Sequence, residues 1–423
     1  MDREETLALL DEGIEERGFH SVGGTRATRS SGSSGAITLS DVDGVLRWDI
    51  GGKRRVTRGE SKRLKSYRFE DLSPNQISKK LRDLDAWLTP NQGLYQIEQG
   101  RIRDESLPVS EGRILLFIHG TFSNTENLVG AFHNTAEGQA FLTWASDHYD
   151  QILAFGHPTL SVSPFLNAVN LSRIFATSNA EVDVICHSRG GLVARWWLEA
   201  ITPPDAPTRR VVFVGAPLGG TGLATPANIR QSLDLLANFS AKLATAAGIG
   251  SVILPIAAPI FQASAVVASI VSMVSSAGAS TPAVDAAVCL IPDLAAQSRQ
   301  SANNEILGLR KGFAAESIRE RLDTQTQRYF FVVANFETDD PGWAFWRVFR
   351  NIPGRAADAL TDVVFDGTND LVVDTASMTD LADDFGELDR ERQIKDFGTT
   401  DQVHHCNYFQ FPETIAFIQK SIA

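Results

Sequence analysis

The feature that most constrains this chain is a short apolar run that ends abruptly in small residues. Residues 182–186 are rich in β-branched side chains, His-Ser-Arg-Gly-Gly follows them, and residues 192–198 then have a helical pattern. A strand that runs into a helix with a serine at the corner has the pattern of a nucleophile elbow. Such a turn is tight, so Ser188 must adopt a strained backbone conformation, and the residues two positions away must be small. Gly190 meets this demand, and Cys186, which stands where glycine is usual, is small enough for us to expect the turn to form.

This turn would favour chemistry at Ser188 in two ways. It lifts the hydroxyl clear of the sheet, and the helix that follows places the Arg189 N–H where negative charge would develop. The alternative interpretation is a buried strand followed by a helix, with Ser188 as an N-cap that has no chemical role. Because the S-x-G pattern is short, the choice depends on the rest of the chain.

Further apolar runs predict the sheet to which this strand belongs. They cover residues 113–120, 151–155, 210–215 and 329–334, and residues 392–397 are a plausible last strand. Continuous apolar strands are typical of a sheet buried on both faces, and helical segments between them indicate βαβ units. The sequence therefore predicts an α/β fold, with a twisted, mainly parallel sheet and helices on both faces.

Residues 1–110 show no catalytic constellation, and we interpret them as an N-terminal accessory region. Helices are expected over residues 2–17 and 73–88, and two short strands over residues 36–56. The basic residues between positions 57 and 66 are interpreted as a solvated loop or helix face, since the chain has a net charge of -12. The same acidic balance argues against a nucleic-acid partner.

Residues 111–423 are expected to form the catalytic domain, with an apolar helical cap or lid inserted over about residues 221–327. Within this insertion, residues 243–284 contain no Asp, Glu, Lys or Arg. We consider three interpretations of this segment: helices buried in or over the core, a lid that also makes peripheral contact with a membrane, and a membrane span. A span needs about 20 mostly apolar residues, and prolines and a glutamine interrupt this segment.

A nucleophilic serine needs a base within hydrogen-bond reach and a carboxylate that orients the base. The chain order Ser, Asp, His favours Asp370, which lies in a polar turn before an apolar run, with Asp366 and Asp374 as rivals. His404 and His405 are adjacent, so both cannot point at the same serine. We prefer His405 as the base and keep His404 as the alternate.

The oxyanion hole is expected at the end of the first apolar strand. There Gly120 lets the chain turn closely, and the Thr121 and Arg189 N–H groups would donate to an oxyanion together. His119 precedes the nucleophile in the chain, so we expect it to brace this loop through hydrogen bonds. The sequence has no His, Asp or Glu cluster with ligand-like spacing and no phosphate-binding loop, so no metal or other cofactor is expected.

Five motifs in a fixed order resemble those of the α/β-hydrolase superfamily, in particular its lipase- and esterase-like members. They are Ile118-His-Gly-Thr-Phe122, Cys186-His-Ser-Arg-Gly-Gly191, Val214-Gly-Ala-Pro-Leu-Gly-Gly220, Gly367-Thr-Asn-Asp-Leu-Val-Val373 and His405-Cys-Asn-Tyr-Phe409. The resemblance covers about residues 111–423. It implies an α/β-hydrolase fold, a triad of Ser188, His405 and Asp370, and ester hydrolysis through an acyl-enzyme. Cys186 departs from the family pattern, and so does an insertion over about residues 336–364.

The leading hypothesis is therefore a serine hydrolase that acts on small-molecule or lipid esters. An acyltransferase, a thioesterase or an amidase would use the same triad, and an inactive hydrolase-fold protein that docks on a partner or a membrane is the alternative from another class. The three cysteines are too few and too scattered for a disulfide framework. The acidic start of the chain is not a secretory signal, so we expect a cytoplasmic protein.

Overall fold

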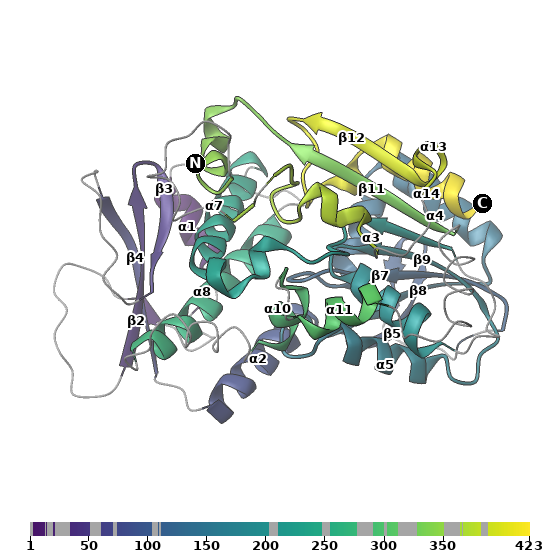
Figure 1. The fold of residues 1–423 in the computed structure, drawn as a ribbon, viewed down its shortest axis with the longest axis horizontal. Coiled ribbons are helices and arrows are strands. Elements are labelled where there is room, and N and C mark those ends of the chain that lie inside the picture. The colour runs from purple at the N-terminus through teal and green to yellow at the C-terminus, as the bar shows by residue number, and fades with distance from the viewer. Residues whose placement is uncertain are drawn as a thin grey trace. The chain divides into compact units, whose positions relative to one another are not determined.

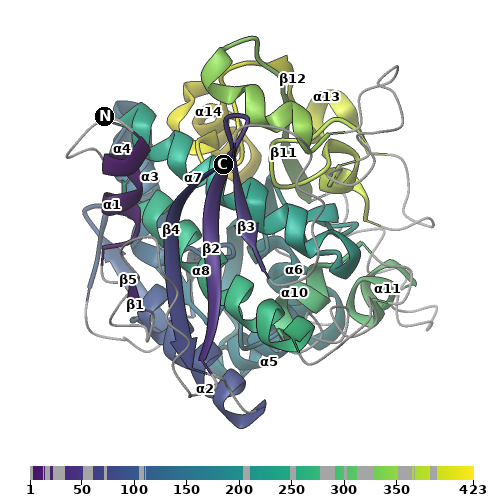
Figure 2. The same cartoon turned by 90° about the vertical axis from the view of Figure 1, so that its left-hand side faces the viewer.

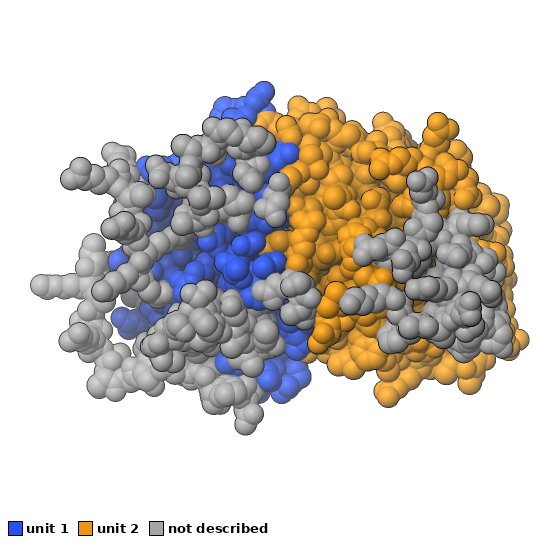
Figure 3. Space-filling view, viewed as in Figure 1, with its two compact units in different colours: residues 1–84, 223–295, 339–366 blue, residues 85–222, 296–338, 367–423 orange. Residues whose placement is uncertain are grey.

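The chain forms two compact units, which Figure 3 shows in different colours. Unit 1 comprises residues 1–84, 223–295 and 339–366, and unit 2 comprises residues 85–222, 296–338 and 367–423. The structure, a computed structural model, describes residues 3–12, 14, 20–21, 34–50, 61–70, 74–103, 109, 111–202, 210–247, 254–276, 291–299, 303–311, 328–350, 364–365, 367–381 and 388–423.

Unit 2 is built around a sheet of eight strands in the order β12-β11-β10-β9-β7-β8-β5-β6 (Figure 1). Six neighbouring strands are parallel: β7 (Arg113–Ile118), β8 (Gln151–Gly156), β9 (Glu181–His187), β10 (Val211–Val214), β11 (Tyr329–Phe336) and β12 (Ile394–Thr400). The antiparallel strands β5 (Gly93–Glu98) and β6 (Arg101–Ile102) extend one edge. The predicted α/β class is confirmed, and every strand expected from an apolar run is present.

Helices cover both faces of this sheet, because alternate residues of each central strand point in opposite directions. Ile114 and Leu116 belong to one core, and Leu115 and Phe117 belong to the other. The first core includes residues of α5 (Pro164–Ile174), α6 (Gly190–Arg195), the π-helix η2 (Trp196–Ile201) and α11 (Asn304–Lys311). The second includes residues of α3 (Thr125–His133), α4 (Ala136–His148) and α14 (Pro412–Ile422).

The strand order reverses between β7 and β9. After β7 the chain enters α3 on one face of the sheet, and after β9 it enters α6 on the other face. In open α/β sheets, ligands bind beside the carboxyl ends of the strands at such a switch point. The two loops that diverge here carry Gly120, Thr121 and Ser188.

Unit 1 combines N-terminal residues with residues inserted much later in the chain. Its antiparallel sheet has the order β1-β4-β2-β3, formed by β1 (His20–Ser21), β2 (Ser34–Val42), β3 (Val45–Asp49) and β4 (Ser61–Glu70). The helices α7 (Ile229–Ala247) and α8 (Leu254–Ser276) pack on β3 and β2 (Figure 2), and α1 (Arg3–Leu10) packs on both helices.

The structure describes several further elements. They are α2 (Pro74–Leu88), α10 (Pro292–Gln297) and α13 (Arg390–Gln393), with 3-10 turns η3 (Gly222–Ala224), η4 (Pro226–Asn228), η5 (Pro341–Val348), η7 (Thr375–Thr379) and η8 (Tyr408–Gln410).

Side chains of α7 cover the edge of the unit 1 sheet. Asn238 Oδ1 accepts a hydrogen bond from Leu46 N at 2.9 Å, and Asn238 Nδ2 donates to Leu46 O at 2.8 Å. Asp234 Oδ1 accepts from Trp48 N at 2.6 Å. A strand at the edge of a sheet has unpaired N–H and C=O groups, and α7 pairs those of β3.

Two expectations for the N-terminal region differ from the structure. The boundary expected at residue 110 does not separate the units, because residues 85–110 belong to unit 2 and the inserted residues 223–295 belong to unit 1. The basic residues Lys62 and Lys65 lie on strand β4 rather than on a loop or a helix. They form ion pairs with Glu4 and Asp11 at 2.8 and 3.0 Å.

Helix α8 contains most of the described residues of the uncharged segment 243–284, and it is buried in a core shared with the N-terminal sheet. The Phe261 ring centroid lies 5.7 Å from that of Trp48. Gln262 Nε2 donates to the carbonyls of Leu10 and Glu12 at 3.1 and 2.9 Å. In the part of the chain that the structure describes, no helix has the length and apolar character that crossing a bilayer requires.

Asn238→Ala is expected to lower the free energy of unfolding by roughly 2–6 kcal/mol, because it leaves the Leu46 N–H and C=O without a partner, and each buried unpaired group costs about 1–3 kcal/mol. Urea titration followed by tryptophan fluorescence measures this change. Ser240→Ala on the same helix is the control, since Ser240 Oγ donates to Leu236 O at 2.7 Å within the helix and its loss orphans no strand group. Equal midpoints for the two variants would contradict the role of α7 at the sheet edge.

Candidate active site

Ser188 lies at a sharp turn between β9 and α6. Its φ of 54° is in the left-handed region, which residues other than glycine rarely adopt. The Ser188 N–H donates to Val214 O at 2.9 Å. A Cβ atom at Gly190 would lie 2.4 Å from Ile118 O, so only glycine fits there. Cys186 is fully buried, and the tight turn forms with a thiol where glycine is usual.

The loop after β7 approaches the serine closely. A Cβ atom at Gly120 would lie 2.7 Å from Ser188 Cβ, so this residue must also be glycine. Thr121 follows Gly120 in the chain, and Arg189 follows Ser188. Their backbone N–H groups stay the expected donors to an oxyanion.

His119 braces the loop, as expected from its place in the sequence. The His157 N–H can only donate, so His119 Nε2 accepts from it at 3.3 Å, and the proton must be on Nδ1. Nδ1 then donates to Gly120 O at 3.1 Å. Burial lowers the pKa of His119 to about 3, and the charge of Arg189 adds to this effect against the opposing hydrogen bond to Gly120. The imidazole is therefore neutral at ordinary pH.

The Arg189 side chain connects the serine turn with the segment that precedes α5. It is fully buried, and Nη2 donates to Val162 O at 2.8 Å. Burial lowers the pKa of the guanidinium to about 9, while the charges of Asp85 and Glu305 act in the opposite direction. The side chain is thus held in the protein, and only the backbone N–H of Arg189 is a candidate for binding an oxyanion.

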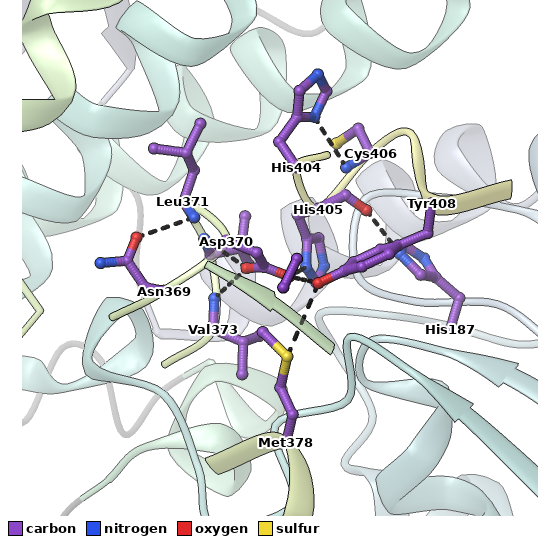
Figure 4. A network of polar contacts seen from close by, with 12 residues as sticks. His187, Asn369, Asp370, Leu371, Val373, Met378, His404, His405, Cys406 and Tyr408 are labelled. Atoms are coloured by element: carbon purple, nitrogen blue, oxygen red, sulfur yellow. Dashed lines mark hydrogen bonds and ion pairs between the residues drawn. The ribbon is translucent and has the colours of Figure 1, made fainter. Parts of the chain in front are cut away.

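Asp370 and His405 form a buried pair at the same edge of the sheet (Figure 4). His405 Nδ1 lies 2.8 Å from Asp370 Oδ2. Asp370 Oδ1 accepts from Val372 N at 3.1 Å and from Val373 N at 2.8 Å, and the His405 N–H donates to Asp370 O at 3.0 Å. Burial acts to raise the pKa of Asp370, but the charge and hydrogen bond of His405 and the two backbone N–H groups outweigh it, and the pKa lies below its usual range.

The other candidates for base and acid lie elsewhere. Figure 4 shows the His404 ring directed away from Asp370, and His404 Nδ1 accepts from Cys406 N at 3.3 Å. Asp374 forms an ion pair with Arg299 at 2.9 Å. Asp366 lies outside the described residues. The pair that the structure brings together is thus the preferred one.

Two contacts connect the serine turn with the His405 loop. His187 Nε2 lies 2.9 Å from His405 O, so the residue before Ser188 holds the backbone of the histidine. Gly215 follows Val214, the acceptor of the Ser188 N–H, and a Cβ atom at Gly215 would lie 3.3 Å from His405 Nδ1. Among the described residues Ser188 Oγ has no hydrogen-bond partner; catalytic contacts of this kind are often long before substrate binds.

Sequence reasoning missed two residues of this site. Tyr408 donates its hydroxyl to Asp370 Oδ2 at 3.0 Å, and its only sequence trace is its place three residues after His405. Gln297 Nε2 donates to Thr121 Oγ1 at 3.0 Å, and no local pattern marks it. The structure thus brings an imidazole and an ionised carboxylate together, and His187 connects them with the turn of Ser188. Within the described ranges no three His, Cys, Asp or Glu side chains are arranged to hold a metal ion.

Comparisons with known proteins give the following. The family model described as "Domain of unknown function (DUF7379)" matches residues 83–423. A search of curated proteins finds none that matches the chain. Among solved structures, the chain is similar to the mature form of lipase BlEst2 from Bacillus licheniformis, with a TM-score of 0.35 and 12% identity over 74% of this chain and 94% of that chain. It is also similar to lipase 1 from Pelosinus fermentans, with a TM-score of 0.36 and 14% identity over 73% and 99%. Because both TM-scores are low, these similarities say nothing about the activity of this chain.

The buried histidines are expected to make the protein labile to acid. Burial, the main cause, lowers the pKa of both His119 and His404 to about 3, below the value of about 6.5 in an unfolded chain. The unfolded chain therefore takes up these protons first, and the free energy of unfolding falls as the pH falls from about 6.5 towards 3, by up to about 1.4 kcal/mol per pH unit for each histidine.

Urea unfolding at several pH values between 5 and 7 measures this slope. Burial also lowers the pKa of His157 and His187, so His404→Gln removes one of four such groups and is expected to make the slope shallower by one histidine's share. A slope that does not change in this variant would show that His404 is not buried in the neutral form.

Proposed function

The chain belongs to the DUF7379 family of unknown function, and we propose that it is a serine hydrolase that cleaves carboxylic esters through an acyl-enzyme. The observation that carries this proposal is the hydrogen-bonded pair of His405 and Asp370, which His187 connects with the turn of a serine that has a positive φ. A strained serine at a strand-to-helix turn is the nucleophile placement of α/β-hydrolases. The proposal therefore places the chain with their lipase- and esterase-like members.

In the first half of the reaction, Ser188 Oγ attacks the ester carbonyl carbon. His405 Nε2 takes the serine proton, while Nδ1 keeps its proton on the hydrogen bond to Asp370 Oδ2. The ionised carboxylate stabilises the imidazolium that forms, and it holds the tautomer that leaves Nε2 as the acceptor. The charge on the carbonyl oxygen develops towards the N–H groups of Thr121 and Arg189, and such a donor is typically worth about 3–4 kcal/mol.

The first half ends when His405 gives this proton to the leaving alkoxide, which departs as the alcohol and leaves the acyl group on Ser188 Oγ. In the second half, water gives a proton to His405 and attacks the acyl carbon. His405 then returns that proton to Ser188 Oγ as the bond to the acyl group breaks and the acid leaves. His119 supports both halves, because its hydrogen bond to Gly120 O fixes the peptide that carries the Thr121 N–H.

Ser188→Ala is expected to abolish both ester hydrolysis and labelling by a fluorophosphonate probe, because the nucleophilic oxygen is removed. His405→Ala is expected to lower kcat by about 10⁴–10⁶-fold, as the loss of a triad base does. His404→Ala is the matched control, an adjacent histidine whose ring faces away, and is expected to keep most of the activity. Hydrolysis of p-nitrophenyl esters and mass spectrometry of the labelled protein measure these effects.

The outcomes separate the alternatives. If folded wild-type protein is not labelled at Ser188, the chain is an inactive hydrolase-fold protein and the proposal fails. If labelling succeeds but acyl groups pass mainly to added alcohols rather than to water, the activity is that of an acyltransferase. Parallel assays with thioester and amide substrates show whether the protein cleaves those bonds faster than esters.

The uncharged residues of the insertion favour a lipid or another apolar acyl group as substrate. Esters with long acyl chains are therefore expected to have a higher kcat/KM than esters with short ones, since burial of each methylene contributes about 0.8 kcal/mol. A chain-length series of p-nitrophenyl esters measures this. A preference for short chains would contradict an apolar acyl substrate.

A further inference from the structure

Tyr408 has a place in the site that the reaction described above does not use. It begins the turn η8, it is completely buried, and its hydroxyl lies 3.0 Å from Asp370 Oδ2. Its second neighbour is Met378 Sδ at 3.8 Å, which is a weak acceptor. A buried phenol needs a hydrogen-bond partner, and here that partner is the carboxylate beside the base.

The carboxylate of Asp370 is thereby fully engaged. Oδ1 accepts from Val372 N and Val373 N, and Oδ2 accepts from both His405 Nδ1 and Tyr408 Oη. Tyr408 and His405 thus share one oxygen atom, as Figure 4 shows. Each donor to a carboxylate spreads its charge and lowers its basicity, so the hydroxyl weakens the attraction of that oxygen for the imidazole.

The packing around the tyrosine ring leaves it little freedom to move. A Cβ atom at Gly215 would lie 2.9 Å from Tyr408 Cε2 and 3.2 Å from Asp370 Oδ2, so the glycine, with φ of 56°, lies against both side chains. The ring also belongs to the core beneath the sheet that contains residues of α3, α4 and α14. The hydroxyl is therefore held at a fixed position by apolar packing.

We propose that Tyr408 is a positioning residue, whose hydroxyl fixes Asp370 Oδ2 and limits how strongly that oxygen binds His405. This inference rests on the proposed function, because it assigns Tyr408 to the triad of that reaction. In a hydrolase of this kind, an imidazole bound too tightly by its carboxylate stays protonated at higher pH and is lost as a base. The phenol therefore extends activity towards acidic pH.

Several other ionisable groups lie around the pair of Asp370 and His405. They are His187 from β9, His404 and Cys406 from the loop of His405, and Asp396 from β12. Burial, the main cause in each case, lowers the pKa of His187 and His404 to about 3 and raises that of Cys406 to about 12. Burial and then the charge of Asp370 raise the pKa of Tyr408 well above its ordinary value, so it remains a donor.

The test is the pH profile of kcat/KM for Tyr408→Phe. The acidic limb is expected to move to higher pH by roughly half to one unit, the effect of removing one donor from a carboxylate. At the alkaline plateau KM stays the same, and kcat falls by less than the ~10²-fold loss of a misplaced catalytic group. A purely structural tyrosine would lower activity at all pH values without moving the limb, and that result would overturn the inference.

Tyr149→Phe is the matched control. The Tyr149 hydroxyl donates to a second buried carboxylate, Asp183 Oδ2, at 2.8 Å, and Asp183 also accepts from Arg210 Nη2 at 3.0 Å near the start of β9. The chemical change is the same, but it lies at the opposite end of the strand from Ser188. This variant is expected to keep the wild-type pH profile.

Two further measurements keep the test decisive. Site-specific 3-fluorotyrosine at position 408 makes the phenol a stronger donor in an unchanged fold, and the acidic limb is expected to move to lower pH. An unmoved limb would again overturn the inference.

Proton NMR of the His405 Nδ1–H is independent of turnover. Its resonance is expected to move downfield in Tyr408→Phe, because its hydrogen bond to Asp370 strengthens. If wild-type protein has no activity that depends on Ser188, the proposed function fails, while this resonance still decides whether Tyr408 controls the pair.

Discussion

The geometry of the site depends on the close approach of two loops at the carboxyl ends of β7 and β9. Gly120 and Gly190 each stand where a single added methyl group would overlap atoms of the opposite loop, at 2.7 Å from Ser188 Cβ and 2.4 Å from Ile118 O. The two loops can approach this closely only because both residues are glycines, and the backbone rather than the side chain of Ser188 sets its position. A residue held from both sides can keep a left-handed conformation that costs about 1–3 kcal/mol. The backbone of Ser188 is therefore held in this conformation by the fold itself.

The second constraint is the burial of the carboxylate of Asp370. A buried charge is costly unless hydrogen bonds replace its water, and Asp370, with no exposed surface, accepts from four donors. These donors come from the acid's own turn and from the loop of His405, so the charge is stabilised by the segments that it must bring together. His187 adds a bond to the His405 carbonyl from the strand that ends at the serine. One network of hydrogen bonds thus stabilises the turn of Asp370 and orients the His405 ring.

Much of this arrangement is predictable from the sequence. Strands buried on both faces have continuous apolar runs, and five such runs give the parallel core. The preferred acid and base are the two residues that the structure joins at 2.8 Å. Strand β4 was missed because Lys62 and Lys65 mask its alternation, although Tyr67 and Phe69 are buried as an alternating strand requires. Strands β5 and β6 were missed because an antiparallel edge strand has no apolar run of the kind that marks a central strand.

The residues that sequence reasoning could not place depend on contacts between distant segments. Gln297 reaches Thr121 across 176 positions and Tyr408 reaches Asp370 across 38, and neither side chain differs locally from an ordinary polar or core residue. The sequence also could not show that the insertion belongs to unit 1, because α7 contacts β3 across nearly 200 positions.

The sequence does contain one sign of this contact. Asp234 and Asn238 lie four residues apart, on one face of a helix, and both are buried. Buried polar side chains need partners, and a strand edge with unpaired backbone groups supplies them.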